Sequence, residues 1–148
     1  MKKIIVLIGI ILLISIIIVF FQVNKPATST VTINSAVFRV ELARTSKEQT
    51  QGLSGRGSLP GDTGMLFLFD KPSYRSFWMK GMKFPLDIIF ILNNKVVAVY
   101  ENLPPASEDS NPPQYGSDVI ADSVLEINAW ESAKNNIKIG ETVSIEIK

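Results

Sequence analysis

The 148-residue sequence contains neither cysteine nor histidine. The lack of cysteine excludes disulfides, thiol nucleophiles and a lipid-modified cysteine anchor. The lack of histidine removes the usual general base near neutral pH, the triads built on it and nearly all zinc sites. Any catalysis would therefore depend on carboxylates, lysine, tyrosine or serine. We expect no cofactor and no bound metal.

The sequence also lacks a basic cluster. The formal net charge is +1, from 15 basic and 14 acidic residues, and two of the basic residues are Lys2 and Lys3 at the N-terminus. Without these two lysines, 13 basic residues face 14 acidic ones, a net charge of −1. A nucleic-acid interface would show a basic stripe or patch. We therefore expect no nucleic-acid partner.

A long apolar run follows the two lysines. Ile4 to Phe21 would form a helix of about 27 Å, close to the hydrocarbon thickness of a bilayer. No small-residue cleavage pattern follows it, so a single-pass signal anchor is favoured over a cleaved secretory signal. The lysines would stay on the cytoplasmic side, which places the rest of the chain outside the cell membrane. If the segment is cleaved, the domain is secreted.

The remainder is predicted to be one domain. We assign residues 1–23 to the anchor, 24–30 to a linker and 31–148 to a β-rich extracytoplasmic domain. Period-two alternation and short apolar runs predict seven or eight short strands. The predicted strands cover residues 31–34, 37–43, 65–69, 76–79, 86–92, 95–100, 123–127 and 142–147.

Two short helices complete the predicted fold. Thr45 and Glu48 fit a capping box for a helix that would end at Gly52. A second helix should start near Trp130, whose ring we expect to pack that helix on the sheet, and should end near Asn136. The expected class is β-rich α+β, a compact antiparallel β-sandwich or barrel-like domain, preceded by the transmembrane helix.

A long loop is expected at Glu101 to Asp118, which contains four prolines. Proline removes a backbone donor, so this segment cannot form a central strand. It should lie over the sheet near the strand that contains Trp78, with Tyr115 as its packing anchor. Loops of this kind on a rigid β scaffold commonly carry binding specificity.

Several polar and aromatic residues are candidates for a site. Asp87 and Glu126 are the carboxylates that could act as acid and base of a glycoside hydrolase, although structural roles are more common for such residues. Lys80 and Asp87 bracket a tight segment and could meet, either as a local ion pair or as a charged site. Trp78 could stack on a sugar or a partner residue, although buried aromatic filler is the more common role of such a residue. Candidate binding residues are Trp78, Lys80, Asp87, Arg56, Glu126 and Tyr115.

Six ordered blocks of sequence resemble a known family. They are residues 40–43, Gly52-Leu53 with Arg56 and Leu59, residues 64–67, residues 77–80, residues 85–90 and residues 124–129. In this order they are similar to the prokaryotic domain-of-unknown-function family 192 (DUF192), over about residues 31–148. The resemblance implies a compact β-rich domain with short helices, frequently behind an export signal, and it implies no activity.

The sequence departs from the pattern of that family at three places. Its members commonly carry Asn-Thr where this chain has Gly81-Met82, Gly where it has Trp130, and Met where it has Ser54. A site in the family that used the Asn and Thr side chains would be altered here. Lys80, Asp87 and Glu126 are shared with the family.

Three functions remain open from the sequence. The first is a non-catalytic, membrane-tethered module that binds a ligand, a wall polymer or a protein partner of the cell envelope. The second is a carboxylate-based hydrolase of an envelope carbohydrate, with Asp87 and Glu126 as acid and base and with Lys80 or Arg56 holding an anionic group. The third is a structural envelope protein.

Overall fold

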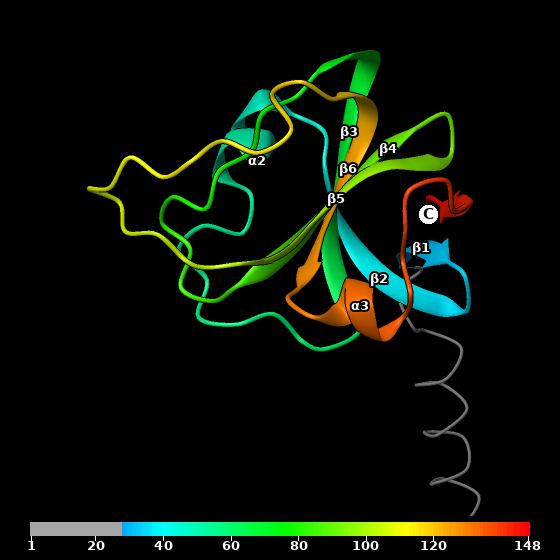
Figure 1. The fold of residues 1–148 in the computed structure, drawn as a ribbon, viewed down its shortest axis with the longest axis horizontal. Coiled ribbons are helices and arrows are strands. Elements are labelled where there is room, and N and C mark those ends of the chain that lie inside the picture. The colour runs from blue at the N-terminus through cyan, green and yellow to red at the C-terminus, as the bar shows by residue number, and fades with distance from the viewer. Residues whose placement is uncertain (1–27) are drawn as a thin grey trace, which may run out of the picture.

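The computed structural model of the protein describes residues 28–148. These residues form seven β-strands and two short helices (Figure 1). The elements are β1 (Ser29–Ile33), β2 (Ala36–Ala43), α2 (Ser46–Gln51), β3 (Thr63–Tyr74), β4 (Leu86–Leu92), β5 (Lys95–Leu103), β6 (Ile120–Asn128), α3 (Glu131–Lys134) and β7 (Val143–Glu146).

The strands form one sheet with the order β5-β4-β6-β3-β2-β1-β7. Neighbouring strands are antiparallel except β2 and β3, which are parallel because the α2 crossover returns the chain to the same end of the sheet. The sheet curls until its edge strands approach, and the Val143 amide donates to the Asn94 carbonyl at 2.9 Å. Lys95 and Thr142 form a β-bridge at the same place. The barrel-like prediction is therefore confirmed as a half-barrel, whereas the sandwich and the all-antiparallel pairing are wrong.

Each face of the sheet buries its own apolar cluster. The inner cluster receives side chains from all seven strands and is capped by Ile137, which follows α3. The outer cluster lies over β3, β4 and β6, and it is covered by Leu53 and Leu59, which follow α2, and by residues 75–85 and 104–119. Because both faces of these three strands are buried, β4 is apolar at nearly every position. The outer cluster positions the candidate site.

Local sequence signals account for most of the turns. The predicted capping box is present, because Glu48 accepts from the Thr45 amide and Thr45 accepts from the Glu48 amide. Asn93 and Asn94 connect β4 to β5 with φ of 50° and 58°, a conformation that asparagine tolerates better than most residues. The predicted ends of α2 and the hairpin are thus confirmed.

Three local predictions differ from the structure. Residues 76–79 form only isolated bridges, Phe77 with Tyr115 and Lys80 with Ala106, and no strand. The long loop begins after Leu103, because β5 continues to that residue, and its placement near Trp78 is confirmed by these bridges. Trp130 is 63% exposed and does not pack its helix on the sheet. Its φ of 73° at the N-cap of α3 turns the side chain outward.

The predicted anchor, Ile4 to Phe21, and most of the predicted linker lie outside the described residues. Within residues 28–148, no helix is long and apolar enough to cross a membrane.

Candidate functional site

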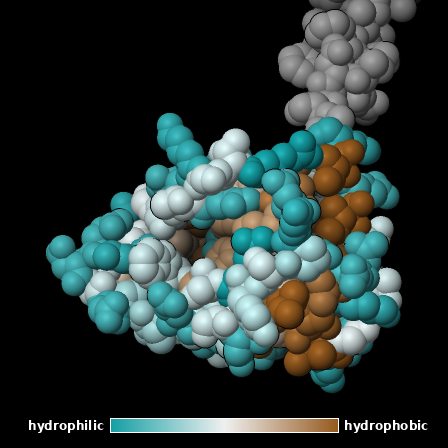
Figure 2. All heavy atoms as spheres, turned by 90° about the horizontal axis from the view of Figure 1, so that it is seen from above, coloured by the Kyte–Doolittle hydropathy of each residue, from teal (hydrophilic) through white to brown (hydrophobic). Residues whose placement is uncertain are grey.

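A pocket of about 400 Å³ lies on the outer face of the sheet, between α2 and the segment that follows β3. Its walls come from α2 and residues 52–54 on one side, from β3, and from residues 74–78 and Met82 on the other. In the view from above, the surface is hollowed, and apolar side chains lie beneath a rim of hydrophilic ones (Figure 2). We call this cavity the Glu126 pocket, after the carboxyl in its lining.

Glu126 projects from β6 into this pocket and is only 5% exposed. It stands opposite Met65 of β3 and Ile88 of β4, two buried apolar residues. Its Oε2 atom is buried and has no hydrogen-bond partner among residues 28–148. Burial raises the pKa of the carboxyl to about 8, while the charge of Arg56 lowers it. At neutral pH Glu126 is therefore mostly protonated and can both donate and accept a hydrogen bond.

The wall formed by α2 is fixed firmly in place. The Gln49 side-chain amide donates to the Leu68 carbonyl at 2.8 Å, which fastens the helix to β3. The helix ends at Gly52, whose φ is 49°. A Cβ atom there would lie 3.3 Å from the Phe67 ring and 3.8 Å from Glu126 Oε2, so glycine leaves the floor of the pocket open.

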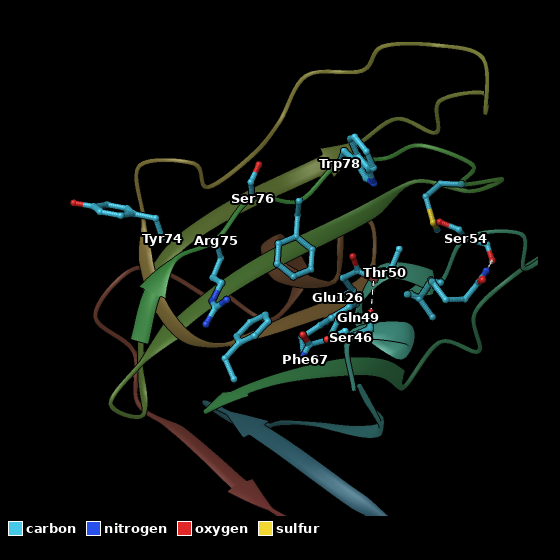
Figure 3. A pocket seen from close by; sticks show the side chains of 16 residues that line it. Ser46, Gln49, Thr50, Ser54, Phe67, Tyr74, Arg75, Ser76, Trp78 and Glu126 are labelled. Carbon is cyan, nitrogen blue, oxygen red and sulfur yellow. Dashed lines mark hydrogen bonds between the residues drawn. The ribbon is translucent and has the colours of Figure 1, made fainter. Parts of the chain in front are cut away.

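The opposite wall carries an arginine and several aromatic rings. The Arg75 guanidinium lies over the Phe69 ring, 3.7 Å from its centroid, and donates to the Lys71 carbonyl at 2.9 Å. Its Nε atom is buried and has no partner within residues 28–148. Trp78 is 49% exposed at the rim. Figure 3 shows Arg75 and Glu126 extending into the pocket, whereas Tyr74 points away from it.

A second recess of about 610 Å³ adjoins the pocket. Both cavities are lined by Ser46, Thr50, Gln51, Ser54 and Trp78, so they lie side by side, and together they are here named the α2 groove. Lys47, Lys80 and Glu108 line its outer part. The Glu108 carboxylate lies where a Cβ atom on Gly81 would be, and Gly81 has a φ of 72°. The glycine at this position therefore makes room for Glu108 in the groove.

Asp87 occupies a different environment. It is fully buried, and its carboxylate accepts from the backbone amides of Asn102 at 2.7 Å, Trp130 at 3.2 Å and Ser132 at 2.8 Å. These bonds join β4 to β5 and to the start of α3. The structure thus gives Asp87 a structural role, and it does not meet Lys80. None of the three ion pairs within residues 28–148 includes Lys80.

Asp87 and Glu126 lie on opposite faces of the sheet. Asp87 stands opposite Ile127, which belongs to the inner cluster, whereas Glu126 stands opposite Ile88, which belongs to the outer cluster. The two carboxyls therefore do not face each other across one cleft, as the acid and base of a glycoside hydrolase would. Lys80, Asp87 and Glu126 also do not share a cleft, because only Glu126 lines the pocket and only Lys80 lines the outer recess.

Two other predicted residues, Arg56 and Tyr115, do not line the groove. Arg56 forms a two-pronged ion pair with Glu41, at 2.6 and 2.7 Å, and this bond lowers the pKa of Glu41. Tyr115 anchors the long loop as predicted. Its backbone exchanges two hydrogen bonds with that of Phe77, and its ring centroid lies 5.6 Å from that of Tyr100. Of the six predicted binding residues, Trp78, Lys80 and Glu126 line the groove.

Sequence reasoning did not select Arg75, Gln49, Thr50 or Ser76. The polar residues of α2 look like an ordinary solvated helix face, because the helix has no buried residue. Arg75 lies two residues before the aromatic pair Phe77-Trp78. An arginine near aromatic residues is the one sequence signal that could have identified Arg75 as a site residue.

The DUF192 family model, described as "Uncharacterized ACR", matches residues 29–145. Among solved structures, the chain is similar to a protein of unknown function from Novosphingobium aromaticivorans, with 40% identity and a TM-score of 0.68 over 80% of this chain and 84% of the other. It is also similar to a Sinorhizobium meliloti protein described as a "putative transcription regulator", with 28% identity and a TM-score of 0.71. That match covers 80% of this chain and 94% of the other. No protein of the curated set matches the chain.

Proposed function

The chain belongs to the DUF192 family, and from that premise we propose that it is a non-catalytic binding module whose site is the α2 groove. The N-terminal apolar run, Ile4 to Phe21, would hold the domain at the outer face of the cell membrane. The groove would then take up a component of the cell envelope.

The unpartnered carboxyl of Glu126 carries this proposal. A buried polar group without a partner lowers stability, and such groups gather at binding and catalytic sites. Glu126 lies in the pocket that is lined by Phe67, Phe69, Phe77 and Trp78. A concave site with aromatic walls and a few polar groups is the usual makeup of a ligand site. A ligand that hydrogen-bonds to Glu126 would satisfy the carboxyl and recover that free energy.

The hydrolase alternative has less support than binding. Hydrolysis of a glycosidic bond by a carboxyl pair needs both groups on the two sides of the scissile bond. Asp87 lies on the other face of the sheet from Glu126, with its oxygens engaged by three backbone amides. The groove therefore offers one well-placed acid, Glu126, with Glu108 in its outer part.

Cosedimentation of the full chain with purified insoluble envelope polymer tests the proposal. The chain is kept in detergent, and the bound fraction is measured for the wild type, Trp78→Ala and Thr50→Trp. Trp78→Ala removes the exposed ring at the rim, and Thr50→Trp fills the junction of the two recesses. Trp78→Ala should lower the bound fraction at least about tenfold, since an aromatic ring that a ligand covers contributes a few kcal/mol. Thr50→Trp should lower it similarly, because the new ring occupies space that the ligand needs.

Trp130→Ala is the matched control, because Trp130 is similarly exposed but lies at α3, outside the groove. It should leave the bound fraction unchanged. Thermal unfolding of each variant verifies that the fold is intact. Capture that persists in both groove variants, or that is lost equally in the control, would show that the groove is not the binding site.

A further inference from the structure

The charges along the α2 groove indicate what kind of ligand it takes. Three basic side chains, Lys47, Arg75 and Lys80, line the groove, and Glu108 is its one carboxylate besides Glu126. Because Glu126 is mostly protonated at neutral pH, the lining carries a net charge of +2. The whole chain carries only +1. The groove is thus a local concentration of positive charge, which attracts anions.

Arg75 is placed to bind an anionic group. Its guanidinium already donates one bond, to the Lys71 carbonyl, while the buried Nε–H has no partner among the described residues. A guanidinium hydrogen-bonds well to a carboxylate or phosphate, and its stacking on Phe69 fixes its plane. Figure 3 shows the Arg75 guanidinium and the Glu126 carboxyl at different places in the pocket. The pocket therefore has one position with a cation and another with a neutral acid.

The remaining lining suits a carbohydrate. Trp78 exposes half of its surface at the place where the two recesses join, and such a ring can stack on a sugar. Four hydroxyl side chains line the same pocket, each with an oxygen that can accept from a ligand hydroxyl. They are Ser46, Thr50, Ser54 and Ser76. The neutral Glu126 carboxyl adds a donor and an acceptor deeper in the pocket.

The backbone of the groove argues against an extended peptide. Peptides that bind in extended form use an unpaired strand edge for main-chain hydrogen bonds. Residues 77–81 are already paired with the long loop, through Phe77 and Tyr115, and through Gly81 and Ala106. Recognition in this groove must therefore rely on side chains, as it does for sugars.

We propose that the α2 groove binds an acidic oligosaccharide, with a sugar carboxylate at Arg75 and a sugar ring on Trp78. This inference rests on the proposed binding function and narrows its ligand class. Lys80 and Lys47 would lie beside the following sugar units in the outer recess.

Fluorescence titration of the full chain tests this ligand class. The chain contains two tryptophans, so Trp130→Phe leaves Trp78 as the only emitter. Trigalacturonate is the probe, and its fully methyl-esterified form is the neutral control with the same rings. Trigalacturonate should bind at least about tenfold more tightly than the ester, because hydrogen bonds to charged groups are the stronger ones.

Two charge variants identify the residue responsible. Arg75→Gln should reduce the preference for the acid over the ester to within about twofold while leaving the affinity for the ester nearly unchanged. Lys138→Gln removes the same charge at a separate recess beside α3 and should keep the preference. Loss of affinity for both ligands in Arg75→Gln would show that Arg75 supports the fold of the groove, which would overturn its assigned contact.

The outcomes also separate this inference from the proposed function. Equal binding of acid and ester, or tighter binding of a triglutamate peptide, overturns the acidic sugar while the groove remains a binding site. If no sugar changes the Trp78 emission but envelope polymer is still captured through Trp78, the ligand class is wrong and the function stands. If envelope capture also fails, both are wrong.

Discussion

Replacing Glu126 by glutamine should stabilise the protein. Burial raises the pKa of this carboxyl from its ordinary value of 4.5 to about 8, so the folded state holds the proton more tightly than the unfolded chain. The stabilisation that the protonated Glu126 carboxyl contributes to the folded state is fully present below pH 4.5. It is lost as the pH rises toward 8. The total loss is at most about 5 kcal/mol, and about 3 kcal/mol of it has occurred at pH 7.

Glu126→Gln keeps the size of the side chain and cannot ionise. Urea unfolding of the full chain, followed by tryptophan fluorescence, should therefore show little difference between variant and wild type at pH 5. At pH 7 the variant should be more stable by about 3 kcal/mol, and at pH 9 by up to about 5 kcal/mol. The exposed control Glu101→Gln should stay within about 0.5 kcal/mol of the wild type at each pH.

A particular result would refute this reasoning. If wild type and Glu126→Gln lose stability in parallel between pH 5 and pH 9, the carboxyl does not carry its proton into the folded state. Glu126 would then not be buried without a partner in solution, and the groove would not contain a neutral acid at pH 7.

Three further substitutions test the environments of Asp87, Lys80 and Trp130. Asp87→Asn should lower the free energy of unfolding by about 1–3 kcal/mol, because one buried amide such as that of Ser132 would lose its acceptor. Lys80→Met should change the free energy of unfolding by less than about 1 kcal/mol. Equal effects of the two substitutions in denaturant melts would contradict the structural role of Asp87. Trp130→Gly should raise stability by about 1 kcal/mol, since the φ of 73° suits glycine. A lower melting temperature of this variant would show that the exposed ring makes a stabilising contact.

Much of the fold could be predicted from local sequence signals. The capping box at Thr45 and the asparagines at the β4–β5 turn act within a few residues, and such short-range chemistry determines the local backbone. The parallel pairing of β2 with β3 could not be predicted, because it depends on how residues 44–62 cross the sheet. Period-two patterns identify strands but do not specify their neighbours.

The placement of Asp87 and Glu126 on opposite faces could not be predicted for the same reason. Each lies in a strand that was predicted correctly, and both are buried and acidic. Which face each side chain occupies depends on the register of β4 against β6, where Ile88 stands opposite Glu126. A shift of one residue would have placed Asp87 opposite Glu126, with both carboxyls on the same face. Register between distant strands is set by the whole packed core, so the sequence of either strand alone does not reveal it.

The same two residues show how structural and functional burial of a carboxyl can be told apart. Asp87 is surrounded by three backbone amides that would themselves lack acceptors without it, so its burial and theirs are mutually supporting. Glu126 has an unpartnered oxygen, opposes two apolar residues and opens on a cavity. Nothing in the fold requires a carboxyl at that position, because an apolar residue would pack there at no electrostatic cost. The proposed ligand of the α2 groove would account for a carboxyl that the fold itself does not need.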